Sequence, residues 1–237
     1  MFKFFTRLLF PPIIRLLFAA TVVGRRNMPA SGGVILASNH LSFFDSVILS
    51  LLARRPVSFL AKAEYFTGKG IKGWLSRVFF ESIDAIPVHR DSASAAQDAL
   101  DAGLERLVDG EAFAMYPEGT RSLDGRLYRG KTGVAWLALT ANVPVVPVAL
   151  TGTDKIQPVG SRGIRLAKLR VEFGQPMNLS SYGAASSGKA RREATDAIMD
   201  EIAAMSGQEL AGIYNERPAT TVKQRVRRLF RGRAPLT

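Results

Sequence analysis

The sequence predicts an α/β fold with a mixed, largely parallel sheet and helices on both faces, together with an N-terminal membrane-associating helical segment. Two observations predict the sheet. Short apolar runs alternate along the chain with stretches of helical periodicity, a pattern typical of parallel strands joined by crossover helices. The length of 237 residues is within the range of one α/β domain. No internal repeat or second domain is evident in the sequence.

Each expected element follows from its local pattern. Short apolar runs predict strands at 33–37, 57–61, 112–116, 143–150 and 169–173. Helical patterns predict helices between them at 46–53, 70–80, 92–108 and 131–141. After the last strand, Gln175-Pro176 breaks the chain and 183–188 is a loop of small residues. Residues 190–214 then have the pattern of a long amphipathic helix.

A histidine and an aspartate follow the first strand, in the stretch Asn39-His40-Leu41-Ser42-Phe43-Phe44-Asp45. Junctions between a strand and a helix expose side chains. An imidazole can take a proton from a hydroxyl, and a carboxylate on its other nitrogen fixes the tautomer and stabilises the imidazolium. The stretch therefore predicts a His40–Asp45 general base. The alternative is that Asp45 only caps a helix.

A second polar segment, Met115-Tyr116-Pro117-Glu118-Gly119-Thr120-Arg121-Ser122, follows the strand at 112–116. Gly119 allows close approach of a ligand to the backbone, and the guanidinium of Arg121 is suited to a phosphate or a carboxylate. The segment predicts an oxyanion receptor. A surface turn with one solvated arginine is the alternative.

These two segments and a third, Asn142-Val143-Pro144-Val145-Val146-Pro147-Val148-Ala149-Leu150, together resemble the glycerolipid acyltransferases, most closely the 1-acylglycerol-3-phosphate acyltransferases. That family has an Asn-His-x-x-x-x-Asp block, an arginine-ended block, a Glu-Gly-Thr-Arg block and a Val-Pro-rich strand in this order. Here the second block is Asp84-Ala85-Ile86-Pro87-Val88-His89-Arg90. The resemblance runs from about Arg25 to Gly174 and implies transfer of a fatty acyl group from a thioester to a lysophospholipid hydroxyl.

The resemblance also implies roles for single residues. His40 would be the catalytic base and Asp45 would orient it. Substrate-binding roles would fall to Asn39, Lys62, Arg90, Glu118, Gly119, Thr120, Arg121 and Pro144, with the cations Lys62, Arg90 and Arg121 meeting one phosphate. Asp84 stands where the family usually has glycine, and His89 where it often has aspartate. Apart from the resemblance, Lys62 and Arg90 are compatible with solvated surface charges, and Pro144 with an edge strand or a bulge.

The composition excludes several other chemistries. The chain has no cysteine, which excludes thiolate catalysis and thiolate metal sites, and two histidines leave little for zinc. We expect no metal and no cofactor, with acyl-CoA or acyl carrier protein as the co-substrate. The run from Gly125 to Thr132 matches the letters of a nucleotide-binding P-loop, but no strand leads directly into Gly125. Because the letters of the motif match, a P-loop NTPase is an alternative function.

The net charge of +12 lies at the two ends of the chain. Residues 1–26 carry five basic and no acidic residues, and 217–237 carry seven basic and no acidic residues, which leaves the remainder neutral. This distribution suits an anionic bilayer better than nucleic acid. We expect 1–26 to be an in-plane membrane anchor, 27–216 the acyltransferase domain and 217–237 a basic amphipathic tail. The alternative for 1–26 is a helix packed on the core, and the alternative for 217–237 is a disordered tail.

The interpretation is thus a monotopic enzyme at the cytoplasmic face of the cell membrane, whose partners are membrane lipids, a lysophospholipid acceptor and acyl-CoA or acyl carrier protein. An acyltransferase acting on another lysophospholipid or a glycolipid is one alternative. A membrane-binding module without catalysis is another. The sequence motifs alone do not distinguish these acceptors.

Overall fold

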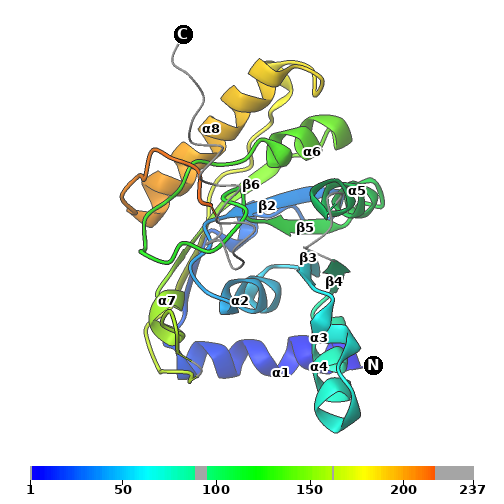
Figure 1. The fold of residues 1–237 in the computed structure, drawn as a ribbon, viewed down its shortest axis with the longest axis vertical. Coiled ribbons are helices and arrows are strands. Elements are labelled where there is room, and N and C mark those ends of the chain that lie inside the picture. Colours follow the sequence, from blue (N-terminus) through cyan, green and yellow to red (C-terminus); the bar gives the residue numbers. More distant parts are fainter. Residues whose placement is uncertain (1, 89–94, 162, 217–237) are drawn as a thin grey trace, which may run out of the picture.

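The computed structural model describes residues 2–88, 95–161 and 163–216. One seven-stranded sheet forms the centre of the molecule (Figure 1). Its strands, in spatial order, are β1 (Thr21–Val23), β7 (Arg170–Phe173), β6 (Val145–Thr151), β2 (Val34–Ser38), β5 (Ala112–Met115), β3 (Val57–Lys62) and β4 (Ala85–Val88). Only β6 and β7 pair antiparallel, so the predicted mixed, largely parallel sheet is confirmed.

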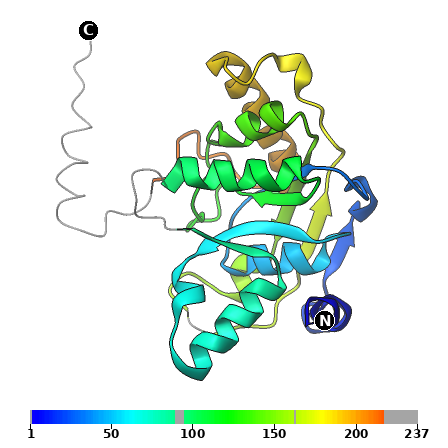
Figure 2. The ribbon, with the colours of Figure 1, turned by 90° about the vertical axis from the view of Figure 1, so that its right-hand side faces the viewer.

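Helices cover both faces of the sheet, as predicted (Figures 1 and 2). They are α1 (Phe2–Leu17), α2 (Phe44–Leu52), α3 (Glu64–Thr67), α4 (Gly70–Ser82), α5 (Ala95–Val108), α6 (Gly133–Ala141), α7 (Thr153–Ile156) and α8 (Gly188–Ser206). One buried apolar cluster joins the sheet to α1, α2, α4 and α7. A second cluster joins its other face to α5, α6 and α8.

The central strand β2 explains where the polar segments meet. Every residue from Val34 to Ser38 is buried, because β2 lies between the parallel strands β5 and β6 and is covered on both faces. The carboxyl ends of β2 and β5 lie side by side at one edge of the sheet. The loops that leave these two strands, 39–43 and 116–132, are therefore neighbours, and open α/β sheets bind ligands at this edge.

The structure differs from the sequence prediction at two short strands, two short helices and one helix end. β1 has only three residues, and β4 contains Pro87, which argues against a strand in the sequence, so neither was predicted. The four-residue helices α3 and α7 were not predicted either. The helix predicted to reach residue 214 ends at Ser206, which corrects that prediction. Gly207 has a φ of 65° and accepts the left-handed conformation that terminates helices.

The N-terminal helix α1 packs one face on the protein and exposes the other. Ile14 is buried in the core, and the Arg7 guanidinium contacts the Asp84 carboxylate at 2.9 Å. Exposed apolar side chains on the other face are Phe5, Leu8, Leu9, Phe10, Ile13, Leu16 and Leu17. The part of 1–26 beyond α1 joins the body, since Thr21–Val23 is a strand of the sheet. Among the described residues, no helix has the length and apolarity needed to cross a membrane.

Candidate active site

The His40 imidazole and the Asp45 carboxylate form a hydrogen-bonded pair at the carboxyl end of β2. The distance from His40 Nδ1 to Asp45 Oδ2 is 2.8 Å, and the side chains are 15% and 0% exposed. A carboxylate only accepts hydrogen bonds, so Nδ1 carries the proton and Nε2 is the basic nitrogen. The His40–Asp45 contact expected from the sequence is therefore present, with Nε2 on the side of the ring away from Asp45.

Asp45 also fixes the loop that carries the histidine. Its Oδ2 accepts the backbone N–H groups of Leu41 at 2.6 Å and Ser42 at 2.8 Å, at the start of α2. Leu41 and Ser42 precede α2, and no side chain caps the amino-terminal end of this helix, so Asp45 binds the loop and is not a helix cap. Because one carboxylate oxygen binds both the loop backbone and the imidazole, the position of the ring is tied to the position of the helix.

Tyr116 holds the imidazole from a second side. The two rings stack at 4.0 Å between centroids with an interplanar angle of 16°, and the Tyr116 hydroxyl lies 2.8 Å from Ser46 Oγ. Burial and the nearby Asp45 charge raise the pKa of Tyr116 well above its ordinary value of 10. Tyr116 therefore stays neutral. Tyr116 was not among the predicted site residues, although an aromatic residue just before the Pro-Glu-Gly turn was a usable signal.

Glu118 was predicted to line a phosphate site, and the structure corrects this. Its side chain is fully buried, and its two oxygens accept the backbone N–H groups of His40 and Tyr128, each at 3.0 Å. Ser122 N also donates to His40 O at 2.8 Å. Glu118 thus joins the loop after β5 to the loop after β2. A side chain enclosed in this way holds the two loops together and is not exposed to a ligand.

Glu118 should give the stability of the protein a distinctive pH dependence. Burial raises the pKa of Glu118 from 4.5 to about 7. Between these values the folded protein binds more protons than the unfolded chain, so the contribution of Glu118 is fully present below pH 4.5 and is lost as pH rises through about 7. The free energy of unfolding of wild type relative to Glu118→Gln should fall by about 3 kcal/mol across that window. Urea titrations at several pH values measure it, and a difference that stays constant with pH would contradict it.

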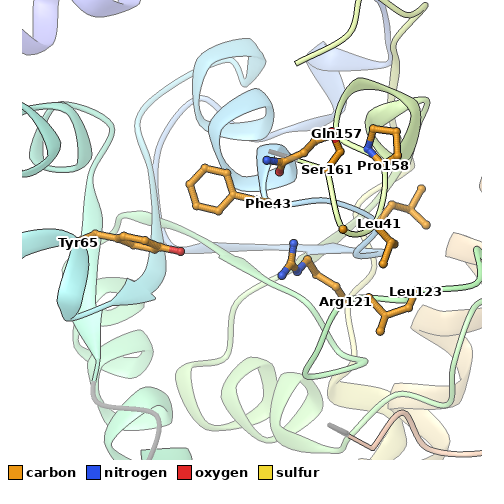
Figure 3. A pocket seen from close by; sticks show the side chains of 10 residues that line it. Leu41, Phe43, Tyr65, Arg121, Leu123, Gln157, Pro158 and Ser161 are labelled. Atoms are coloured by element: carbon orange, nitrogen blue, oxygen red, sulfur yellow. The ribbon is translucent and has the colours of Figure 1, made fainter. Parts of the chain in front are cut away.

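A pocket of about 460 Å³ opens beside the pair, and Arg121 is its basic side chain. Figure 3 shows the Arg121 side chain extending towards the space between Phe43, Tyr65 and Gln157. Leu41, the neighbour of His40, lines the same pocket. The remaining lining residues are Leu123, Pro158, Val159, Gly160 and Ser161. The pocket therefore combines apolar walls with one guanidinium, and Leu41 connects it to His40 along the chain.

Gly119 and Thr120 lie at the turn before Arg121. Gly119 has a φ of 76°, and a Cβ atom placed on it would lie 2.8 Å from Lys131 Nζ. The Lys131 side chain therefore packs against the turn, where it adds a second cation near the motif. In the sequence, Lys131 stood out only as part of the P-loop pattern.

Four predicted substrate-binding residues remain: Asn39, Pro144, Lys62 and Arg90. The buried Asn39 amide donates to Leu150 O at 2.9 Å and its Oδ1 accepts Leu150 N at 2.8 Å, so Asn39 joins β2 to β6. Pro144 O accepts Ile35 N at 3.1 Å, at the opposite end of the sheet, roughly 16 Å from His40 along the strand. These two predictions of substrate contact are wrong. Lys62 is exposed at the carboxyl end of β3, on the correct edge, and Arg90 lies outside the described residues.

A protein-family model described as Acyltransferase matches residues 19–151, more than half of the chain. The chain belongs to the acyltransferase family. The chloroplastic 1-acyl-sn-glycerol-3-phosphate acyltransferase BAT2 of Brassica napus is 35% identical over 148 residues, which are 62% of this chain and 41% of the relative. The 1-acyl-sn-glycerol-3-phosphate acyltransferase of Bacillus subtilis is 26% identical over 192 residues, 80% of this chain and 89% of the relative.

The fold of this acyltransferase is also found in a solved structure. The crystal structure of the 1-acyl-sn-glycerophosphate (LPA) acyltransferase PlsC from Thermotoga maritima matches with a TM-score of 0.65 and 25% sequence identity, over 86% of this chain and 79% of that chain. The chain spans about two fifths of the length of the plant and algal relatives that it matches.

The P-loop alternative does not fit the backbone of this acyltransferase. Strand β5 ends at Met115 and α6 begins at Gly133, so the Gly125–Thr132 run does not connect a strand directly to a helix. Amide groups that would cradle a phosphate are occupied: Leu127 N donates to Glu209 O at 2.8 Å and Arg129 N donates to Ile213 O at 2.9 Å. Among the described residues, no group of three metal-ligating side chains is present.

Residues 207–216, beyond the matched region, run across the loop that carries Arg121. Leu127 pairs with Leu210 in an isolated bridge. Asn215 Nδ2 donates to Arg121 O at 3.1 Å, and Gln208 Nε2 donates to Gly125 O at 2.7 Å. This segment of the acyltransferase therefore contacts the Arg121 loop, although the two are about 90 residues apart in the sequence. Local sequence patterns do not reveal a contact of this kind.

Proposed function

We propose that this protein transfers a fatty acyl group from acyl-CoA or acyl carrier protein to the free sn-2 hydroxyl of lysophosphatidic acid, which gives phosphatidic acid. The observation that carries the proposal is the 2.8 Å contact between His40 Nδ1 and Asp45 Oδ2, which leaves Nε2 available beside the pocket of Arg121. The family membership and the names of the relatives support the same reaction.

The reaction needs no nucleophile from the protein. His40 Nε2 takes the proton of the acceptor hydroxyl, and the oxygen attacks the thioester carbonyl to form a tetrahedral intermediate. The C–S bond then breaks, the ester remains on the lipid, and the leaving thiolate takes the proton from the imidazolium. Asp45 stabilises the imidazolium between these two steps. A thioester is activated for this attack, so positioning and proton transfer by the pair supply the catalysis.

We assign the phosphate of the acceptor to the cations near the pocket. Arg121 extends into it, Lys131 packs against Gly119 in the adjacent turn, and Lys62 is exposed at the same edge of the sheet. A phosphomonoester offers nearly two negative charges and several acceptor oxygens, which suit a guanidinium. The exposed apolar face of α1 would lie in the bilayer on the cytoplasmic side, as a peripheral anchor that does not cross it.

The acceptor preference tests the assignment of Arg121. With one acyl-CoA, wild type should acylate lysophosphatidic acid much faster than monoacylglycerol. Arg121→Ala should raise the KM for lysophosphatidic acid by about 10- to 100-fold, because a charge-assisted hydrogen bond contributes about 1.5–3 kcal/mol. The KM for monoacylglycerol should change little, because that acceptor has no phosphate.

Arg126→Ala is the matched control. Arg126 belongs to the same loop, but it is paired with Asp124 at 2.8 Å and is not among the residues lining the pocket. Its loss should leave the acceptor preference intact. Equal wild-type rates on lysophosphatidic acid and monoacylglycerol would contradict a phosphate site. A strong preference for a glycolipid would instead assign the chain to the alternative acceptor.

A further inference from the structure

Two further groups of exposed apolar side chains lie outside α1. The first is at the amino-terminal end of α4, where Ile71, Trp74 and Leu75 are 79%, 57% and 54% exposed. The second is in the segment between α7 and β7, where Val159, Ile164 and Leu166 are 62%, 59% and 73% exposed. Exposed apolar patches of this kind mark sites of contact with a protein, a membrane or a ligand.

These groups lie at the same end of the molecule as α1. In Figure 1 the α3–α4 hairpin and the segment after α7 extend downwards to the level of α1, on the side away from α5, α6 and α8. Figure 2 shows the hairpin and α1 at the same lower end after a quarter turn. Three elements that are distant in sequence therefore reach one side of the molecule.

The α3–α4 hairpin is held in this position by close packing. A Cβ atom on Gly73 would lie 2.0 Å from Gly68 O, so only glycine allows the two helices to approach as they do. Ser76 Oγ donates to Tyr65 O at 2.8 Å, and the Tyr65 and Phe80 rings stack at 4.7 Å. With their helix fixed in this way, the exposed side chains cannot turn inward to be buried by the protein.

Basic side chains surround both apolar groups. Exposed lysines and arginines on or beside α4 are Lys69, Lys72 and Arg77, and those near the second group are Lys155, Arg165 and Lys168. The acidic residues exposed on the α3–α4 hairpin are Glu64 and Glu81. Apolar side chains flanked by lysine and arginine match a surface whose head groups are anionic and whose interior is hydrocarbon.

We propose that the α4 tip (Ile71, Trp74 and Leu75) and the 158–166 segment (residues 158–161 and 163–166, with residue 162 outside the described residues) insert into an anionic lipid bilayer together with α1. The proposal rests on the membrane association of α1 proposed above and adds two contacts to it. Val159 belongs both to this segment and to the wall of the Arg121 pocket. Contact of the segment with lipid therefore places the pocket wall at the membrane surface, where a lysophospholipid acceptor resides.

The two tryptophans of the chain provide a direct test. Trp74 is at the α4 tip, whereas Trp136 is half-buried on α6, on the other face of the sheet. Trp136→Phe leaves Trp74 as the single fluorophore, and Trp74→Phe leaves Trp136. Both proteins are mixed with vesicles of phosphatidylcholine and phosphatidylglycerol whose acyl chains are brominated. The fluorescence of Trp74 should fall severalfold, and that of Trp136 should not change.

A second pair of variants tests the 158–166 segment. Ile164→Ser combined with Leu166→Ser should weaken binding to the same vesicles, measured by co-sedimentation, by about tenfold or more, since partial immersion of each aliphatic group is lost. Leu210→Ser combined with Ile213→Ser is the matched control. These two residues are 60% and 61% exposed, but they belong to the segment that follows α8. Their replacement should leave vesicle binding unchanged.

The outcomes separate this proposal from the reaction. Unquenched Trp74 in a protein that co-sediments with vesicles would overturn the α4 contact and leave the α1 anchor standing. Unquenched Trp74 in a protein that dimerises, with the dimer lost in Trp74→Ser, would assign the α4 tip to a second copy of the chain. Quenched Trp74 without acyl transfer would support the membrane contact and contradict the proposed reaction. Transfer to a dispersed short-chain acceptor with Trp74 unquenched would support the proposed reaction and contradict the membrane contact of the α4 tip.

Discussion

Replacement of His40 by alanine should lower the rate of acyl transfer by about 10²- to 10⁴-fold and leave the fold intact. In the proposed reaction the imidazole takes the proton of the acceptor hydroxyl, so its loss removes the proton transfer that accompanies attack on the thioester. Its contacts within the protein are few: one hydrogen bond to Asp45 and the stacking on Tyr116. Initial rates of CoA release with lysophosphatidic acid measure the effect.

The thermal midpoint and the circular dichroism spectrum of the His40→Ala protein provide the control. They should remain close to those of wild type, because the loop backbone stays bound to Asp45 and Glu118. A variant that keeps more than about a tenth of the wild-type rate would remove His40 as the base, since proton transfer by a positioned side chain contributes at least about 10²-fold.

Asp45→Asn should reduce the rate almost as strongly, by a factor on the order of 10⁴ if the pair works as in the Ser-His-Asp template. The amide keeps the size of the carboxylate and can still accept the N–H groups of Leu41 and Ser42. It cannot stabilise an imidazolium by charge, and its NH₂ group cannot fix the productive tautomer. Steady-state rates of the purified variant measure the loss.

The same substitution separates the two roles of Asp45. The side-chain oxygen of asparagine can accept the same two N–H groups of Leu41 and Ser42. A residue that only holds the loop would therefore tolerate Asp45→Asn with a small change in both the thermal midpoint and the rate. A near-normal thermal midpoint with a strongly reduced rate is the result that we expect. Near-normal values of both would leave Asp45 only as an acceptor for the loop backbone and contradict the orienting role.

Sequence patterns predicted the parts of the fold that depend on local periodicity. The buried strands β2, β5 and β6 are continuous apolar runs, because parallel strands covered on both faces need such residues. The His40–Asp45 pair was predictable for a similar reason, since both residues belong to one short loop and the first turn of α2. The end of α8 was mispredicted, although Gly207 was a usable stop signal.

The features that sequence could not predict depend on contacts between distant segments. From its own loop, Glu118 was predicted to line a phosphate site. Only the packing of that loop against residues 39–41 shows that its carboxyl group is buried and bound to backbone amides. Asn39 likewise binds Leu150, more than 100 residues away. Asn215 supports the Arg121 loop from beyond the last predicted strand. Local motifs identify such residues without showing what they contact.

The most direct test of the His40–Asp45 base and its lipid acceptor is product formation by the purified protein. Acyl-CoA and 1-acyl lysophosphatidic acid are supplied together, and free CoA and phosphatidic acid are measured in the same samples. We expect equal amounts of the two products, acylation at the sn-2 oxygen, and almost no CoA release when the acceptor is omitted. CoA release at the same rate with and without lysophosphatidic acid, or phosphatidic acid formation undiminished in His40→Ala, would contradict the account.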